Sequence, residues 1–110
     1  MESLSQRHSA RGATVADDGI PLHFGDGAGE FAAALTGTVL FDRSHEARVR
    51  LDGDERYPFL QRLSTNNVLK LAAGAGCPTI FTTPNGRVID RAEVYANETQ
   101  ALLIGGPGRA

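Results

Sequence analysis

Three side chains that could act together in acyl transfer stand almost side by side in the sequence: Asp42, Ser44 and His45. A serine nucleophile needs a histidine base within hydrogen-bond reach. Neighbouring side chains on an extended chain point to opposite faces, so Ser44 and His45 cannot readily meet in this way. The G-x-S-x-G elbow of serine hydrolases is also missing from the sequence. We therefore expect Asp42 and Ser44 to hold a turn through local hydrogen bonds, and His45 to pack.

Asp90 is the acid whose position asks for an explanation. On a strand over 88–95 it shares one face with Val88, Ala92 and Val94, while the other face carries Ile89, Arg91, Glu93 and Tyr95. A carboxylate on an apolar face beside a pocket is a candidate for general acid-base chemistry or ligand binding. The alternative is structural: the face is solvated, or Asp90 accepts hydrogen bonds from turn amides. The pattern leaves both interpretations open.

The other chemical motifs are weak. The sequence "GDGAGE" places Glu30 where the third glycine of a dinucleotide-binding fingerprint should stand, and no phosphate-binding G-x-x-x-x-G-K-[ST] occurs. Cys77 has no evident activating neighbour, so we expect it to serve as a small buried hydrophobe. We predict no metal site, because the candidate ligands are far apart in the sequence: His8, His23, His45 and Cys77.

Composition indicates one small folded domain. The chain has 110 residues, of which 41% are apolar and 22% charged, with a net charge of -2. The basic residues are scattered, which argues against nucleic acid or an anionic membrane as a partner. One cysteine excludes an internal disulfide, the first twenty residues lack an apolar signal-peptide core, and no apolar run could span a bilayer. These features favour the cytoplasm.

The folded part is expected to begin near residue 20. Residues 1–19 are polar and aperiodic, so we predict a flexible amino-terminal tail. A glycine-rich loop should lead into a short helix over 30–35 that ends near Gly37. Alternating residues predict a strand over 46–52, and Asp54 can cap a helix that tolerates Pro58 within its first turn. On that helix one face is expected to hold Arg56, Phe59, Leu60 and Leu63.

The segment from Cys77 to Gly106 predicts consecutive strands. Pro84, Asn85 and Gly86 are typical of a hairpin turn, and "NET" at 97–99 marks a second turn before an apolar run over 101–104. We expect a three-stranded antiparallel meander. With the preceding helices, this order predicts an α+β fold in which helices pack on one side of an antiparallel sheet.

Taken together, these motifs resemble a known family. The order of a D-x-S-H corner, "FLQRLSTN", "AGAG" and the turn and strand "TPNGRVID" is similar to the folate-binding domain of the glycine cleavage T-protein (aminomethyltransferase) and the YgfZ-like iron-sulfur maintenance proteins. The resemblance runs from Gly37 onward. Members of the family are much longer, so residues 20–110 are expected to be the amino-terminal portion of such a domain, apparently truncated.

The resemblance implies a ligand and a site. It implies binding of tetrahydrofolate or another reduced folate, with Asp90 as catalytic and pterin-binding residue and with Thr65 and Asn66 as further folate contacts. Its implied partners are a lipoyl carrier protein or iron-sulfur proteins. The implied functions are folate-dependent iron-sulfur protein maintenance or one-carbon handling, with aminomethyl transfer to tetrahydrofolate as the alternative. A third possible function is that of a non-catalytic interaction module.

The sequence also departs from both branches. Arg91 follows Asp90 where T-proteins usually carry a second aspartate, and Pro78 stands where an aromatic residue is common. The K-G-C-[YF]-x-G-Q-E signature of the YgfZ-like branch does not occur in these 110 residues. The motifs therefore identify the superfamily better than the branch.

Overall fold

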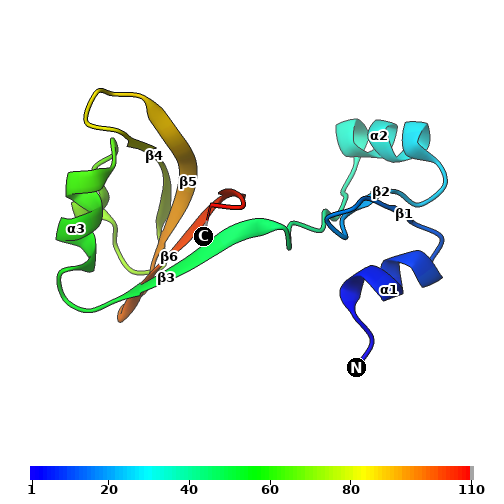
Figure 1. Ribbon diagram of the computed structural model, residues 1–110, viewed down its shortest axis with the longest axis horizontal. Helices are drawn as coiled ribbons and strands as arrows, with labels where there is room; N and C mark the ends of the chain where they lie inside the picture. Colours follow the sequence, from blue (N-terminus) through cyan, green and yellow to red (C-terminus); the bar gives the residue numbers. More distant parts are fainter. Residues whose placement is uncertain (110) are drawn as a thin grey trace. The chain divides into compact units, whose positions relative to one another are not determined.

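The structure, a computed structural model, describes residues 1–109 and divides the chain into two units, Met1–His45 and Glu46–Ala110. The first unit contains α1 (Leu4–Ala10), β1 (Thr14–Val15), β2 (Pro21–His23) and α2 (Gly27–Thr36). The second contains β3 (Glu46–Asp52), α3 (Arg56–Leu63), the 3-10 helix η1 (Val68–Lys70), β4 (Gly76–Thr82), β5 (Val88–Ala96) and β6 (Gln100–Pro107). Figure 1 shows these elements along the chain.

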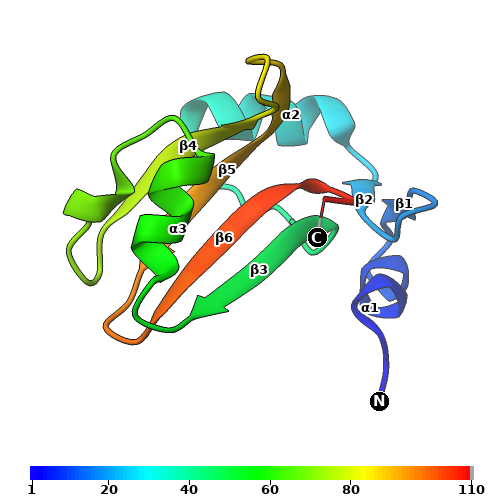
Figure 2. The ribbon, with the colours of Figure 1, turned by 60° about the vertical axis from the view of Figure 1, so that its left-hand side comes forward.

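The second unit is built on a four-stranded antiparallel sheet in the order β3-β6-β5-β4 (Figure 2). The predicted meander of β4, β5 and β6 is confirmed, and β3 pairs with the far side of β6. The hairpin between β4 and β5 turns at Gly86, whose φ of 80° favours glycine. Thr83 holds this turn by donating its N–H to the carbonyl of Arg87 at 2.8 Å. The predicted α+β class is confirmed.

The core of this unit lies between α3, η1 and one face of the sheet. Its buried side chains are Leu60, Val68, Val94, Ala101 and Leu103. The alternation of β5 and β6 places these strand residues on one face, as the sequence pattern predicts. Partly buried side chains pack around this group: Leu51, Tyr57, Leu71, Cys77 and Phe81.

The predicted apolar face of α3 is only partly right. Leu60 is buried, with 1% of its surface exposed, but Phe59 and Leu63 are 46% and 47% exposed. Tyr57, which is one turn before Leu60 on the helix, packs on the core instead. The helix therefore faces the sheet along Tyr57 and Leu60, and Phe59 and Leu63 lie outside that contact.

The start of α3 also differs from the prediction. Its N-cap is Glu55, with no side-chain capping bond, and Asp54 is exposed. Arg56 anchors this turn instead, because its Nη1 donates to the carbonyl of Gly53 at 2.7 Å and its Nη2 to the carbonyl of Glu98 at 2.8 Å. Pro58 lies in the first turn, where a helix needs no backbone donor.

The first unit contains more secondary structure than the sequence predicts. Helix α1 lies within the segment predicted to be a flexible tail, and a capping box between Ser3 and Gln6 begins it. Helix α2 begins at Gly27 instead of Glu30, because Asp26 caps it through the N–H of Gly29 at 3.0 Å. No residue of Met1–His45 is buried. Within residues 1–109, no helix has the length and apolar character needed to cross a membrane.

Candidate functional site

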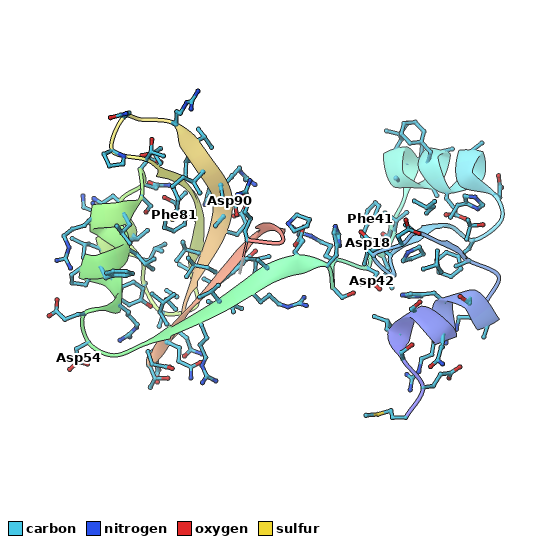
Figure 3. The ribbon with its side chains drawn as sticks, viewed as in Figure 1. Asp18, Phe41, Asp42, Asp54, Phe81 and Asp90 are labelled. Carbon is cyan, nitrogen blue, oxygen red and sulfur yellow. The ribbon has the colours of Figure 1, made fainter. Side chains whose placement is uncertain are left out.

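Asp90 lies on the same sheet face as the core, near the end of β5 that leads from the hairpin turn. Ala92 and Val94 share this face and are buried, as predicted. Val88, predicted to lie there too, is exposed, and the register between β4 and β5 shifts between Phe81 and Thr82. Phe81 is the partner of Asp90 on β4, and Figure 3 shows these two residues on neighbouring strands.

A cavity of about 300 Å³ opens beside Asp90. Its walls come from β3, β4, β5 and β6 and from the residue after the turn that follows β6. Two charged residues border it, Asp90 and Arg109. The rest of the lining is apolar side chains and backbone: Ala47, Val49, Phe81, Ile89, Ala92, Leu103 and Gly105. A small apolar cavity with few polar groups is typical of a ligand site.

Backbone amides hold the carboxylate of Asp90 in place. Gly106 donates its N–H to Oδ2 at 2.9 Å, and Arg91 donates its N–H to Oδ1 at 2.9 Å. Each carboxylate oxygen can accept about two hydrogen bonds, so each keeps room for a further donor. Asp90 therefore accepts backbone hydrogen bonds, but from amides of strands β5 and β6 and not from the turn amides of the structural interpretation. The carboxylate also borders a cavity.

Two glycines on β6 allow this arrangement. A Cβ atom on Gly105 would stand 2.7 Å from Oδ2 of Asp90, and one on Gly106 would stand 3.0 Å from Oδ1. The carboxylate therefore occupies space that any other residue at these positions would fill. Sequence reasoning missed Gly105, Gly106, Phe81 and Arg109 as parts of this site. The signal that could have found the glycines is the "GG" pair at the end of β6, together with the register of β5 and β6.

Thr65 and Asn66 lie outside the lining of this cavity. Thr65 donates its N–H to the carbonyl of Ile80 at 3.1 Å, and its Oγ1 accepts from the N–H of Ile80 at 3.3 Å. Asn66 donates its Nδ2 to the carbonyl of Pro78 at 2.7 Å and its N–H to Oγ1 of Thr79 at 3.1 Å. These bonds attach the segment after α3 to β4. The contact of both residues with folate remains a prediction.

Asp42, Ser44 and His45 do not form a triad. Ser44 donates its N–H to Oδ1 of Asp42 at 2.8 Å, which confirms the predicted turn. Oδ2 of Asp42 meets Nε2 of His8 at 2.7 Å, and the ring of His8 lies edge-on to Phe24 with centroids 5.8 Å apart. Nδ1 of His45 is buried and has no hydrogen-bond partner among the described residues. The base partner of Asp42 is therefore a histidine of α1.

These bonds lower the pKa of Asp42 from 3.8 to about 2, through the Ser44 hydroxyl, then the Ser44 amide, then His8. A depressed carboxyl pKa stabilises the fold above the unfolded value of 3.8, and this contribution is lost as the pH falls through about 2. We expect Asp42→Asn to lower the free energy of unfolding by on the order of 1 kcal/mol at neutral pH, after solvent screening is allowed for. The difference should shrink as the pH falls below 3.8 and vanish below about pH 2. Denaturant titrations across this range measure it.

The matched control is Asp18→Asn, because Asp18 is an exposed acid of the same unit whose Oδ1 accepts only the N–H of Ile20 in the hydrogen bonds of the described chain. Figure 3 labels both acids. A difference between the wild type and Asp42→Asn that stays constant from neutral pH to about 2 would contradict this account of Asp42.

A second and larger cavity, of about 760 Å³, lies in the first unit between α2, β2 and the segment 39–42. Its two acids also form hydrogen bonds, Asp42 with Ser44 and His8, and Glu30 with the N–H of Phe24 at 2.7 Å. No arginine or lysine is among the residues that line this larger cavity. The Asp90 cavity is smaller, but its carboxylate borders the cavity beside an arginine. We therefore place the candidate site at Asp90.

The remaining chemical candidates show no site. Among residues 1–109, no group of three or more histidine, cysteine, aspartate or glutamate residues could hold a metal ion. Burial, and secondarily the carboxylate of Glu93, raises the pKa of the Cys77 thiol. Cys77 packs against the core, so it behaves as the small hydrophobe that the sequence predicts.

Comparison with known proteins gives relatives but no family profile that matches. A chloroplastic protein of Arabidopsis thaliana with a provisional transferase name is 36% identical over 99 residues, which cover 90% of this chain and 23% of that protein. An aminomethyltransferase of Bacillus pumilus is 36% identical over 92% of this chain and 28% of its own length. An aminomethyltransferase of Stenotrophomonas maltophilia is 38% identical over 84% of this chain and 26% of its own length. The chain thus spans about a quarter of the length of the curated relatives that it matches.

Proposed function

Because this chain is an aminomethyltransferase-like segment of the glycine cleavage T-protein type, we propose that it forms part of a folate-dependent transferase and binds a reduced folate in the cavity beside Asp90. One observation carries the proposal. The carboxylate of Asp90, which Gly106 holds at 2.9 Å, borders an apolar cavity and keeps free acceptor positions.

The lining suits the pterin ring of a folate. A pterin is flat, and the edge of its pyrimidine ring carries an amino group and a ring N–H. A carboxylate can accept two such donors side by side, which gives both strength and orientation. Phe81, Ile89 and Val49 offer apolar surface for the faces of the ring. The residues present therefore fit the ligand that the family implies.

Asp90 would orient the ring and help to move protons. When bound, the folate supplies the acceptor for a one-carbon unit. The two backbone amides fix the position of the carboxylate. Its oxygens are therefore already in place to accept hydrogen bonds from a ligand. A carboxylate oxygen at hydrogen-bond distance from a ligand nitrogen can also accept its proton, as a general base must.

The names of the relatives support aminomethyl transfer, and not iron-sulfur protein maintenance, as the process in which this chain takes part. The proposed donor is a lipoyl carrier protein that bears an aminomethyl group. Iron-sulfur proteins, the partners that the YgfZ-like resemblance implied, have no support from these names.

The test is a calorimetric titration of the full chain with tetrahydrofolate under anaerobic conditions. We expect saturable binding by the wild type. Asp90→Asn keeps the shape of the side chain but loses its charge and one acceptor, and it should weaken binding by about 1 to 3 kcal/mol. Asp54→Asn is the matched control, because Asp54 is an exposed acid of the same unit and does not line the cavity. Figure 3 shows the two acids at separate places on that unit.

Two results would count against the proposal. Equal affinities of the wild type and Asp90→Asn would remove Asp90 from the site. The absence of binding by a folded wild-type chain would favour the third interpretation, a non-catalytic interaction module.

A further inference from the structure

We infer that Arg109 is a second specificity-determining residue of the cavity, which donates hydrogen bonds to a carbonyl oxygen on the same ring edge that Asp90 binds. This inference rests on the proposed function, and it narrows the ligand. It requires a heterocycle with N–H donors and a carbonyl acceptor on one edge, a few ångströms apart. The 2-amino-4-oxo pyrimidine ring of a reduced pterin has such an edge.

Arg109 and Asp90 both lie close to Gly106. The Cβ position of Gly106 lies 3.0 Å from Oδ1 of Asp90 and 3.7 Å from Cγ of Arg109. Strand β6 ends at Pro107, and Gly108, with a φ of 69°, turns the chain after it. The turn thus brings the arginine stem back over the glycine that holds Asp90. Both charged side chains therefore border the same small cavity.

The guanidinium of Arg109 is available for a ligand. Asp90 and Arg109 are not within ion-pair distance, and Arg109 makes no hydrogen bond or ion pair with any other residue that the structure describes. Other arginines of this unit are engaged: Arg91 binds Glu93 at 2.6 Å and Arg50 binds Asp52 at 3.4 Å. Arg109 thus keeps five N–H donors at the border of an apolar cavity.

The pair of charges selects a ligand by its hydrogen-bonding pattern. Asp90 offers acceptors and Arg109 offers donors, so a ring edge with donors alone leaves the guanidinium without a partner. A 4-amino group in place of the 4-oxo group would bring N–H donors towards the donors of Arg109. Specificity of this kind depends on the unfavourable contact as much as on the favourable one.

The experiment compares two probes that differ at this position. The full chain is titrated with 6-methyltetrahydropterin, which has the 4-oxo group, and with its 2,4-diamino analogue, at a pH where both are uncharged. The variants are Arg109→Gln, Arg109→Lys, Asp90→Asn and the control Arg87→Gln. Arg87 is an exposed arginine of the β4–β5 hairpin that does not line the cavity. Thermal unfolding of each variant confirms that the fold is retained.

We expect the wild type and Arg87→Gln to prefer the 4-oxo probe. Arg109→Gln should bind this probe on the order of tenfold more weakly and the diamino probe almost unchanged, so the preference should disappear. Arg109→Lys should retain part of the preference for the 4-oxo probe, because the positive charge remains. The rest should be lost with the planar guanidinium and its paired N–H donors. Asp90→Asn should weaken both probes.

The failures can be told apart. If Asp90→Asn weakens both probes while Arg109→Gln changes neither, or changes both by one factor, the role of Arg109 is wrong and the Asp90 site stands. If Asp90→Asn binds both probes as the wild type does, the proposed function itself fails.

Discussion

Leu60→Ala is expected to lower the free energy of unfolding by about 3 kcal/mol, within the range of 2 to 5 kcal/mol for buried leucines. Leu60 is 1% exposed and is the residue through which α3 enters the core with Val68, Val94 and Leu103. Truncation removes buried methyl groups and leaves a cavity that the sheet cannot easily fill. A small domain has only a few kcal/mol of stability in total, so a loss of this size leaves little margin.

Urea denaturation followed by circular dichroism measures this loss. Leu63→Ala is the matched control, since it removes the same atoms from the same helix at a position that is 47% exposed. Its expected cost is below about 1 kcal/mol, because nearly half of its surface is already in water. Similar costs for the two variants would show that α3 does not pack along Leu60.

Gly105→Ala is expected to weaken reduced-folate binding at least as much as Asp90→Asn does, by about 2 to 3 kcal/mol, with a smaller effect on stability. The added methyl would stand 2.7 Å from Oδ2 of Asp90, closer than carbon and oxygen tolerate. Since Gly105 has no positive φ, the backbone itself accepts alanine. The carboxylate must then rotate away from its place beside the cavity, where the methyl also takes up room.

A double-mutant cycle tests this explanation. If Gly105→Ala acts through Asp90, the variant with both substitutions should bind the folate about as weakly as Gly105→Ala alone. Additive losses would indicate that the methyl blocks the ligand directly. Unchanged binding by Gly105→Ala would contradict the close packing of Asp90 against β6.

Local sequence patterns predict the four-stranded sheet of the second unit well, but not the pair of β1 and β2 in the first. Alternation predicted β3 and β5, and the residues 84–86 predicted the hairpin between β4 and β5. Both signals depend on neighbours in the chain, so no knowledge of the fold is needed to interpret them. Asp90 was identified from the same alternation, because a carboxylate among apolar residues on one strand face stands out.

Contacts between distant residues could not be predicted. Asp42 binds His8, 34 positions away, although the sequence places His45 nearly beside it. The need for glycine at position 105 appears only in the structure, where β6 passes so close to the carboxylate of Asp90 that a Cβ atom would not fit between them. The face of α3 was misjudged because Phe59 and Tyr57 are both aromatic, and only packing decides which one turns towards the sheet.

The strand order also bears on how the cavity comes into existence during folding. Strands β4, β5 and β6 are joined by short turns, whereas β3 pairs with β6 only after residues 52 and 100 meet. Closing a longer loop costs more chain entropy, and local contacts form faster. The meander can therefore form first, and β3 joins it afterwards. Ala47 and Val49 of β3 form one wall beside Asp90, so on this loop-closure argument we expect the cavity to be completed by the last pairing of the sheet.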